Sequence, residues 1–138
     1  MKKINFVNNE APYLNAENLN QMQNNMEDAT HRDITSGGNP VKCGYKVDGK
    51  DVYVIKRTLN TGTHSQWNDV NLGITNCKII KVVGTLLSGG YDYVLPYYES
   101  TDVNASLTIY NNTTLKEKHS HVFSTSTLNL LVYFTYNE

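Results

Sequence analysis

The chain has 138 residues, enough for one ordinary domain or for a short arm followed by a domain of about 100 residues. Its formal net charge is −1 and its charged fraction is 18%, below the about 25% of a typical soluble protein, so its 18 Asn and 14 Thr must supply much of the polar surface. Because phosphate binding requires clustered Lys and Arg, this composition argues against a nucleic-acid partner.

The N-terminal segment, residues 1–14, mixes apolar and turn residues and predicts an extended arm with one short strand at Ile4–Val7. Its basic start is followed by Asn and Glu instead of an apolar stretch, which is not the pattern of a signal peptide. No apolar run approaches the length of a membrane span. We therefore expect a protein made in a cytoplasm, without membrane insertion.

Residues 15–31 predict the one helix of the chain. Asn15 is a suitable N-cap, and Leu14 and Leu19 have the spacing of a hydrophobic staple. The apolar positions form a narrow stripe with heptad spacing: Leu19, Met22, Met26 and Ala29. Such a stripe is too narrow to cover a globular core and favours self-association of identical helices. The alternative is that the stripe packs on the β domain of its own chain.

The rest of the chain predicts antiparallel β structure. A Gly- and Pro-containing cluster at residues 36–40 predicts a hinge, so we divide the chain into an arm and trimerising helix (1–35), the hinge, and a β-sandwich domain (41–138). Asp48-Gly49 predicts a hairpin turn. The predicted strands are Val41–Val47, Asp51–Leu59, Cys77–Leu87, Tyr91–Tyr98, Ala105–Tyr110, Lys118–Phe123 and Leu128–Tyr136.

The motifs of common enzymes are not found in the sequence, which has no G-x-S-x-G, no Gly-rich phosphate loop and no H-E-x-x-H. Asp92, Glu99 and Asp102 are acidic residues near aromatic ones, as in a glycosidase, but such carboxylates are far more often solvated loop residues. We therefore expect no enzymatic activity and no cofactor.

Two sets of residues raise the question of a metal site. His119 and His121 would share one face of a strand, so that three copies around an axis would offer six imidazoles, although polar filling of an exposed strand is the more ordinary role. Cys43 and Cys77 have no further ligand at metal-binding spacing. We expect two reduced thiols and predict no metal.

Aromatic residues are the best candidates for contact with a ligand. Trp67 lies in a polar segment, and four tyrosines surround a Gly-Gly turn and a proline: Tyr91, Tyr93, Tyr97 and Tyr98. Aromatic faces beside amides and carboxylates suit the recognition of sugars. Packing of Trp67 under a loop, as a core residue, is the competing interpretation.

Three segments, spread over nearly the whole chain, resemble a known group of proteins. Phe6 to Met22 has the form F-x-N-x-x-x-P-x-L-N-A-x-N-L-N-x-M, which is similar to the start of small fibre and appendage proteins of phages of Gram-positive bacteria. Residues Gly44 to Tyr53 resemble the opening strands of phage fibre tip domains. Leu130 to Tyr136 resembles their closing strand, with Asn137-Glu138 in place of the usual basic residue.

The resemblance implies a homotrimeric virion protein with a helical stalk and a β-sandwich tip that contacts a host cell-wall glycan or surface protein. It also implies attachment to other virion proteins through the N-terminal arm, after assembly in the host cytoplasm. Tail, baseplate and head attachment all remain open. The alternatives are a carbohydrate-binding module without a virion role and a glycan-degrading tip.

Overall fold

The computed structural model describes residues 16–30 and 33–137, with side chains described as far as Asn25 in the first range. The predicted strand at Ile4–Val7, the cap at Asn15 and the side chains of Met26 and Ala29 lie outside the described residues. Contacts divide the chain into two units between Asp33 and Ile34. Each unit is described by itself below.

The first unit contains the helix α1 (Ala16–Thr30). Glu17 lies in its first turn, where a carboxylate interacts favourably with the positive end of the helix dipole. The side chains of Gln21 and Asn25, one turn apart, are joined by a hydrogen bond of 3.0 Å. Leu19 and Met22, two members of the predicted stripe, are 50% and 42% exposed. The helix therefore presents apolar side chains to its surroundings.

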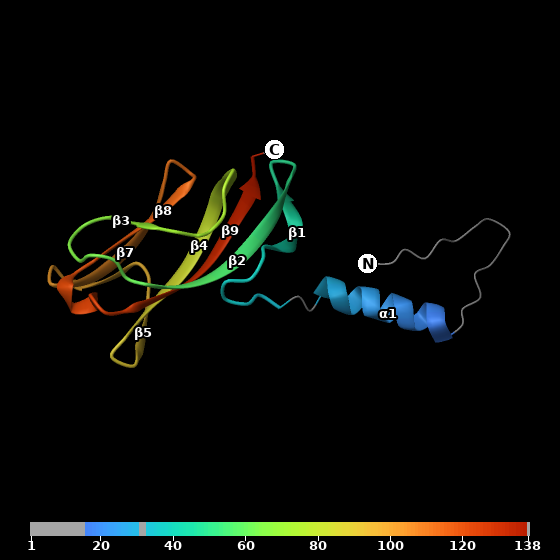
Figure 1. Cartoon of the computed structure of the whole chain (residues 1–138), viewed down its shortest axis with the longest axis horizontal. Helices are drawn as coiled ribbons and strands as arrows, with labels where there is room; N and C mark the ends of the chain where they lie inside the picture. Colours follow the sequence, from blue (N-terminus) through green and yellow to red (C-terminus); the bar gives the residue numbers. More distant parts are fainter. Residues whose placement is uncertain (1–15, 31–32, 138) are drawn as a thin grey trace. The chain divides into compact units, whose positions relative to one another are not determined.

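The second unit is built from antiparallel strands. Its described residues form β1 (Val41–Val47), β2 (Lys50–Asn60), β3 (Asn68–Val70), β4 (Cys77–Ser88), β5 (Tyr91–Val94), β6 (Tyr97–Ser100), β7 (Val103–Tyr110), β8 (Thr114–His119), the 3-10 helix η1 (His121–Phe123) and β9 (Thr127–Tyr136). One sheet has the order β1-β2-β9-β4-β5 and the other the order β3-β8-β7-β6. Figure 1 shows β2, β9 and β4 running side by side, with β3, β7 and β8 forming the second layer. The prediction of a mainly β chain with antiparallel sheets and one short helix is confirmed.

A single hydrophobic core draws residues from both sheets. Its fully buried members include Ile55, Leu86, Leu115, Leu130 and Phe134. Their burial is explained by the alternation of apolar and polar residues along the strands, which is clearest in β9. Two sheets that share one core are what a β-sandwich requires.

Gly84 allows the two sheets to approach each other closely. A β-carbon at this position would come within 2.6 Å of a Leu107 methyl group and within 2.8 Å of a Leu130 methyl group. Leu107 belongs to the smaller sheet and Leu130 to the larger one. A methyl group at this position would therefore force the two leucine side chains to shift within the core.

The Asp48-Gly49 hairpin turn is confirmed. Both residues have positive φ, 50° and 75°, as a two-residue turn between β1 and β2 requires. Residues 36–38 of the predicted hinge are hydrogen-bonded to β2. Gly37 N donates to Lys56 O at 3.2 Å, and the Arg57 guanidinium donates to Gly38 O at 3.1 Å.

Two predicted strands are wrong in detail. Tyr91–Tyr98 is two strands, β5 and β6, which belong to different sheets because the chain crosses between them at the cis peptide bond before Pro96. The predicted strand Lys118–Phe123 is in fact Thr114–His119 followed by η1. Asn111 and Asn112 both adopt positive φ, so the chain reverses tightly and the strand begins earlier than predicted.

Candidate functional site

The loop between β2 and β3, residues 61–67, presents the single tryptophan of the chain. Both its start and its middle are fixed to the rest of the β unit. Thr61 N donates to Ser126 O at 3.0 Å, and Ser65 N donates to His119 O at 2.7 Å. Ser65 has a φ of +64°, which turns the chain just before the tryptophan. The loop thus has a defined path over the edge of the smaller sheet.

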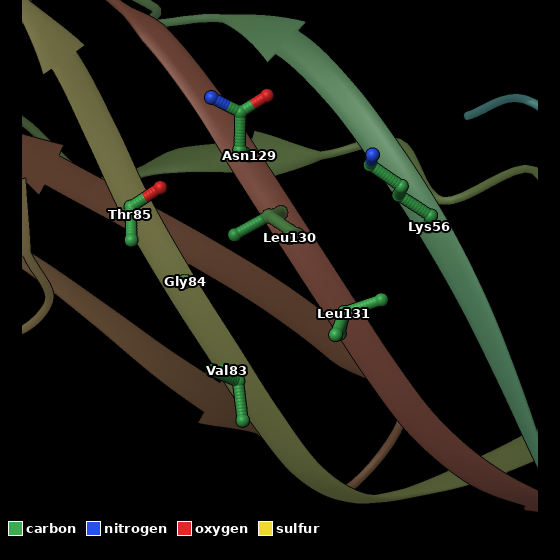
Figure 2. Close-up of a pocket in the computed structure, with 7 residues that line it drawn as sticks. All are labelled: Lys56, Val83, Gly84, Thr85, Asn129, Leu130 and Leu131. Atoms are coloured by element: carbon green, nitrogen blue, oxygen red, sulfur yellow. The ribbon is translucent and has the colours of Figure 1, made fainter. Parts of the chain in front are cut away.

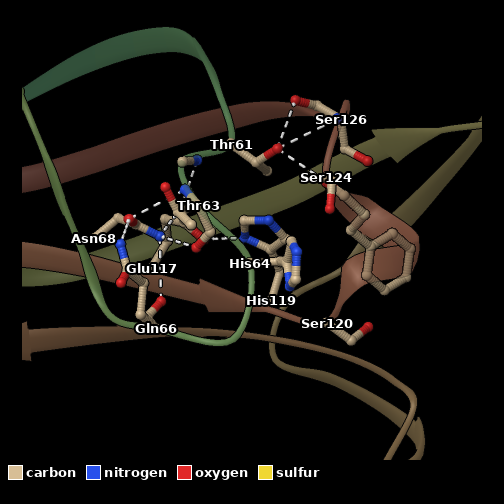
Figure 3. A network of polar contacts seen from close by, with 12 residues as sticks. Thr61, Thr63, His64, Gln66, Asn68, Glu117, His119, Ser120, Ser124 and Ser126 are labelled. Carbon is tan, nitrogen blue, oxygen red and sulfur yellow. Dashed lines mark hydrogen bonds and ion pairs between the residues drawn. The ribbon is translucent and has the colours of Figure 1, made fainter.

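Two side chains below the loop, those of Asn68 and Glu117, hold it from inside (Figure 3). Asn68 accepts a hydrogen bond from Thr63 N at 3.2 Å and donates to Thr63 O at 2.8 Å. One oxygen of Glu117, Oε1, accepts from Gly62 N at 2.8 Å and from the Asn68 amide at 2.9 Å. The loop backbone is therefore bonded to groups that the core itself positions.

Glu117 and His119 form a buried pair at the base of this network. They are 3% and 1% exposed, and His119 Nδ1 lies 2.7 Å from Glu117 Oε2. His119 Nε2 is also buried and has no hydrogen-bond partner among the described residues. Because a carboxylate oxygen only accepts, Nδ1 is the donor of this hydrogen bond. Glu117 then accepts three hydrogen bonds from buried or half-buried donors.

Trp67 is exposed on this fixed loop. Its side chain is 47% exposed, so the interpretation of Trp67 as a core residue is wrong. The Lys118 ammonium lies 6.0 Å from the centre of its ring, at cation–π distance. Lys118 points outward because its neighbours in β8, Glu117 and His119, point inward. An exposed indole, a cation and a rigid backbone are thus gathered at one edge of the sheet.

The four predicted tyrosines separate into two kinds. Tyr93 and Tyr97 pack against each other with ring centres 4.8 Å apart, and Tyr93 also packs at 5.1 Å against buried Phe123. Burial, together with a hydrogen bond to Glu99, raises the pKa of Tyr97. The rings of Tyr93 and Tyr97 therefore pack as part of the hydrophobic core. Tyr91 and Tyr98 are each 70% exposed and are free to contact a ligand.

Exposed Tyr91 and Tyr98 do not belong to one cluster. Tyr91 is the first residue of β5, at an edge of the larger sheet, whereas Tyr98 lies in β6, at an edge of the smaller sheet. Strand alternation directs Tyr98 to the outer face, since its neighbour Tyr97 packs in the core. Trp67 and Tyr98 are thus the exposed members of the predicted contact residues at the edges of the smaller sheet.

The predicted H-x-H geometry is not formed. His119 is the last residue of β8 and is committed to Glu117, whereas His121 is exposed and begins η1. The strand ends between them, so their side chains do not share a face. Within the described ranges, no group of three or more His, Cys, Asp or Glu is placed to hold a metal ion.

Both cysteines are free thiols, with Cys77 buried and Cys43 half-buried. Burial raises the pKa of both. Asp92, Glu99 and Asp102, the acidic residues weighed for catalysis, are all exposed. The contact that Glu99 makes is the hydrogen bond from the Tyr97 hydroxyl at 3.2 Å, which fixes a core-edge ring.

An apolar pocket lies on the outer face of the larger sheet (Figure 2). Its walls are side chains of three adjacent strands, namely β2, β9 and β4. Its lining consists of Lys56, Val83, Gly84, Thr85, Asn129, Leu130 and Leu131. None of the predicted contact residues contributes to this lining. Aliphatic walls without an aromatic ring suit protein contact better than the stacking of sugar rings.

Glu117, Asn68 and Lys118 are the members of the site that the sequence did not reveal. A usable signal was present in the alternating stretch Lys116 to His119, where acidic Glu117 falls on the inward-facing positions between two lysines. Buried carboxylates are rare and require hydrogen-bond partners. The position of Glu117 in the sequence therefore predicts a hydrogen-bond donor for its carboxylate elsewhere in the chain.

Comparison with known proteins identifies no relative: no protein-family model, no curated protein and no solved structure matches the chain. In the part of the chain that the structure describes, α1 falls short of the length and apolar character needed to span a membrane.

Proposed function

We propose that this chain is a fibre protein of a bacteriophage virion. In this proposal three copies associate through their N-terminal helices as a short coiled coil. The N-terminal arm attaches the trimer to other virion proteins. The β units, folded as β-sandwiches, form the tip that contacts the host surface. The likeness of the N-terminal segment to phage fibre proteins motivates the proposal, and two structural features support it.

Exposed apolar residues on α1 support self-association. Leu19 and Met22 are spaced like neighbouring core positions of a heptad, and both are exposed in the single chain. A 15-residue helix with several Asn residues is marginal alone and gains most of its stability from packing. Identical helices around a three-fold axis would cover this stripe and stabilise the helix together.

The observation that carries the host-contact role is the exposure of Trp67 on an immobilised loop. Large aromatic side chains that are exposed and rigidly held lose little conformational entropy on binding, which is why they dominate many recognition surfaces. Here Asn68 and Glu117 supply the rigidity. The loop is therefore suited to binding, and the described residues offer no comparable set of groups for catalysis.

A carbohydrate-binding module without a virion role is the second candidate. The same exposed Trp67 favours it, but this candidate gives no role to the apolar stripe of α1. It requires a monomer, whereas a fibre requires a trimer. A glycan-degrading tip is a third candidate and would shorten polysaccharide chains during incubation, which chromatography of the products would detect.

Binding to intact cells tests the host-contact role. The whole chain, carrying a fluorophore at its N-terminus, is mixed with a panel of Gram-positive strains, and bound fluorescence is measured by flow cytometry. We expect saturable binding to at least one strain, with competition by unlabelled chain. Binding that never saturates, or that unlabelled chain does not reduce, would contradict the proposal.

A further inference from the structure

The outer face of the smaller sheet carries an aromatic residue near each of its two edges. The strand order β3-β8-β7-β6 places Trp67, which directly precedes β3, at one edge and Tyr98 of β6 at the other. The edges are three strand spacings apart, about 14 Å at about 4.8 Å each. Both rings are exposed, so this face has the length for several consecutive sugar units.

Small polar side chains fill the space between the two rings. In β7, Ala105 and Leu107 point toward the core, so Asn104 and Ser106 point outward. The Asn104 amide nitrogen donates to Ser100 O at 3.2 Å and to Thr101 O at 2.8 Å, so its oxygen is the atom that can accept from a ligand. Ser106 is paired with Lys118, the lysine that contacts Trp67. Amides, hydroxyls and an ammonium beside aromatic faces are the groups that recognise sugars, by hydrogen bonds to their hydroxyls and by stacking on their rings.

Two lysines of β8, Lys116 and Lys118, lie on this face, and the charge of Lys118 alone is not compensated by a carboxylate among the described residues. Lys116 forms an ion pair with Asp69 at 3.1 Å and lies 5.0 Å from the ring of Tyr110, so its charge is already compensated. Lys118 forms no ion pair within the described residues, and its contact is the ring of Trp67. An anionic group on a ligand would compensate the charge of Lys118.

Single-stranded nucleic acid also combines rings with negative charge, but the face does not favour it. A nucleic-acid groove follows the backbone with several cations. Here one uncompensated lysine is present, and the chain as a whole has a net charge of −1. One cation between aromatic rings suits a polymer that carries occasional charges on sugar units.

We propose that the outer face of the β3-β8-β7-β6 sheet binds an extended anionic polysaccharide, with sugar rings against Trp67 and Tyr98 and a phosphate or carboxylate group at Lys118. This inference rests on the proposed function, since it specifies what the tip contacts. The shared chemistry is a sugar chain with acidic groups, and the acidic group comes from a phosphate linkage or from a uronic acid.

Trp67 is the sole tryptophan, so the intrinsic fluorescence of the whole chain reports directly on the proposed site. The chain is titrated with glycosylated teichoic acid, with teichuronic acid, with neutral dextran and with a single-stranded oligonucleotide. We expect a saturable change in Trp67 fluorescence with at least one of the two anionic glycans and a weaker response to dextran. The teichoic and teichuronic acids distinguish phosphate from carboxylate as the acidic group.

Two pairs of variants locate the binding. Lys118→Ala is matched by Lys81→Ala, because Lys81 also lies over an aromatic ring, that of Tyr133, but in the larger sheet. Tyr98→Ala is matched by Tyr91→Ala, which removes an equally exposed tyrosine from the larger sheet. We expect Lys118→Ala and Tyr98→Ala each to weaken binding roughly tenfold, with the two matched variants unchanged.

Three results would overturn the inference: no response to either anionic glycan, an equal response to dextran, or tighter binding of the oligonucleotide. Equal effects of the two variants in a pair would also overturn it. Cell binding separates this inference from the proposed function. Saturable binding to cells that is lost after protease treatment, with no glycan response, would refute the polysaccharide and leave the fibre proposal standing.

Discussion

Replacing Glu117 with Gln tests whether the buried network holds the Trp67 loop. The carboxylate accepts hydrogen bonds from Gly62 N at 2.8 Å, from Asn68 Nδ2 at 2.9 Å and from His119 Nδ1 at 2.7 Å. A Gln amide has one oxygen, so it accepts on one side and donates on the other. If the NH2 faces His119, the imidazole must move its proton to the buried Nε2, which has no partner. If the NH2 faces Gly62 and Asn68, donors oppose donors.

The first orientation leaves an N–H at the buried Nε2 without a partner, and the second loses the hydrogen bonds from Gly62 and Asn68, so either costs about 1–3 kcal/mol. For a β unit of this size each kcal/mol lowers Tm by about 4–8 °C, so we expect Glu117→Gln to lower Tm by roughly 4–24 °C. Thermal unfolding followed by circular dichroism measures the shift. Below Tm, iodide quenching of Trp67 fluorescence should increase, because the loop is less firmly held.

Glu99→Gln is the matched control, since Glu99 is exposed and accepts one hydrogen bond at 3.2 Å from Tyr97. Its Tm should stay close to that of the unmodified chain. A Glu117→Gln variant with unchanged Tm and unchanged iodide quenching would refute the role assigned to the network. A lower Tm with unchanged quenching would show that Glu117 stabilises the core without fixing the loop.

Further predictions concern the core, the edge hairpin and the thiols. Gly84→Ala should lower the free energy of unfolding by about 1–3 kcal/mol in urea titrations, because the new methyl group would come within 2.6 Å of a leucine methyl group; an unchanged midpoint would contradict this packing. A hydrogen bond from Lys42 holds the pKa of Asp51 below its ordinary 3.8, so the carboxylate stabilises the fold at neutral pH. The difference in urea midpoint between unmodified chain and Asp51→Asn should therefore shrink as pH falls below 3.8, and a difference that grows would refute it. In a Cys43→Ser background, Cys77 should react with a disulfide reagent at pH 8 only as fast as the chain unfolds, because the residue is 3% exposed and the reagent cannot reach its sulfur in the folded chain. Burial also raises the pKa of this thiol, and rapid labelling of the folded chain would contradict the prediction.

Local sequence signals predicted the parts of the fold that local chemistry determines. Asp48-Gly49 was readable because two adjacent residues at positive φ are uncommon outside Gly, Asn and Asp. The sequence predicts β9 well because every second side chain of this strand points into the core and is apolar. The sequence predicts one strand at Tyr91–Tyr98, because the same apolar and aromatic pattern suits either sheet and Pro96 does not indicate that the chain changes sheets there.

The site depends on contacts between distant residues, which a single sequence does not reveal. The Glu117 carboxylate meets Gly62 and Asn68, which are 55 and 49 positions away along the chain. Aromatic composition suggested Trp67 as a contact residue but also suggested that it fills the core. Its exposure is decided by the path of the loop, and hence by this long-range network.

The mass of the whole chain in solution tests the fibre proposal most directly. Sedimentation velocity at micromolar concentration should give three times the chain mass of 15.6 kDa. Met22→Glu should dissociate the trimer by placing a charge in the helix seam, whereas Asn24→Glu, which adds the same charge on a polar position of α1, should leave it intact. A species of 15.6 kDa for the unmodified chain would contradict the trimeric fibre and favour a free carbohydrate-binding module.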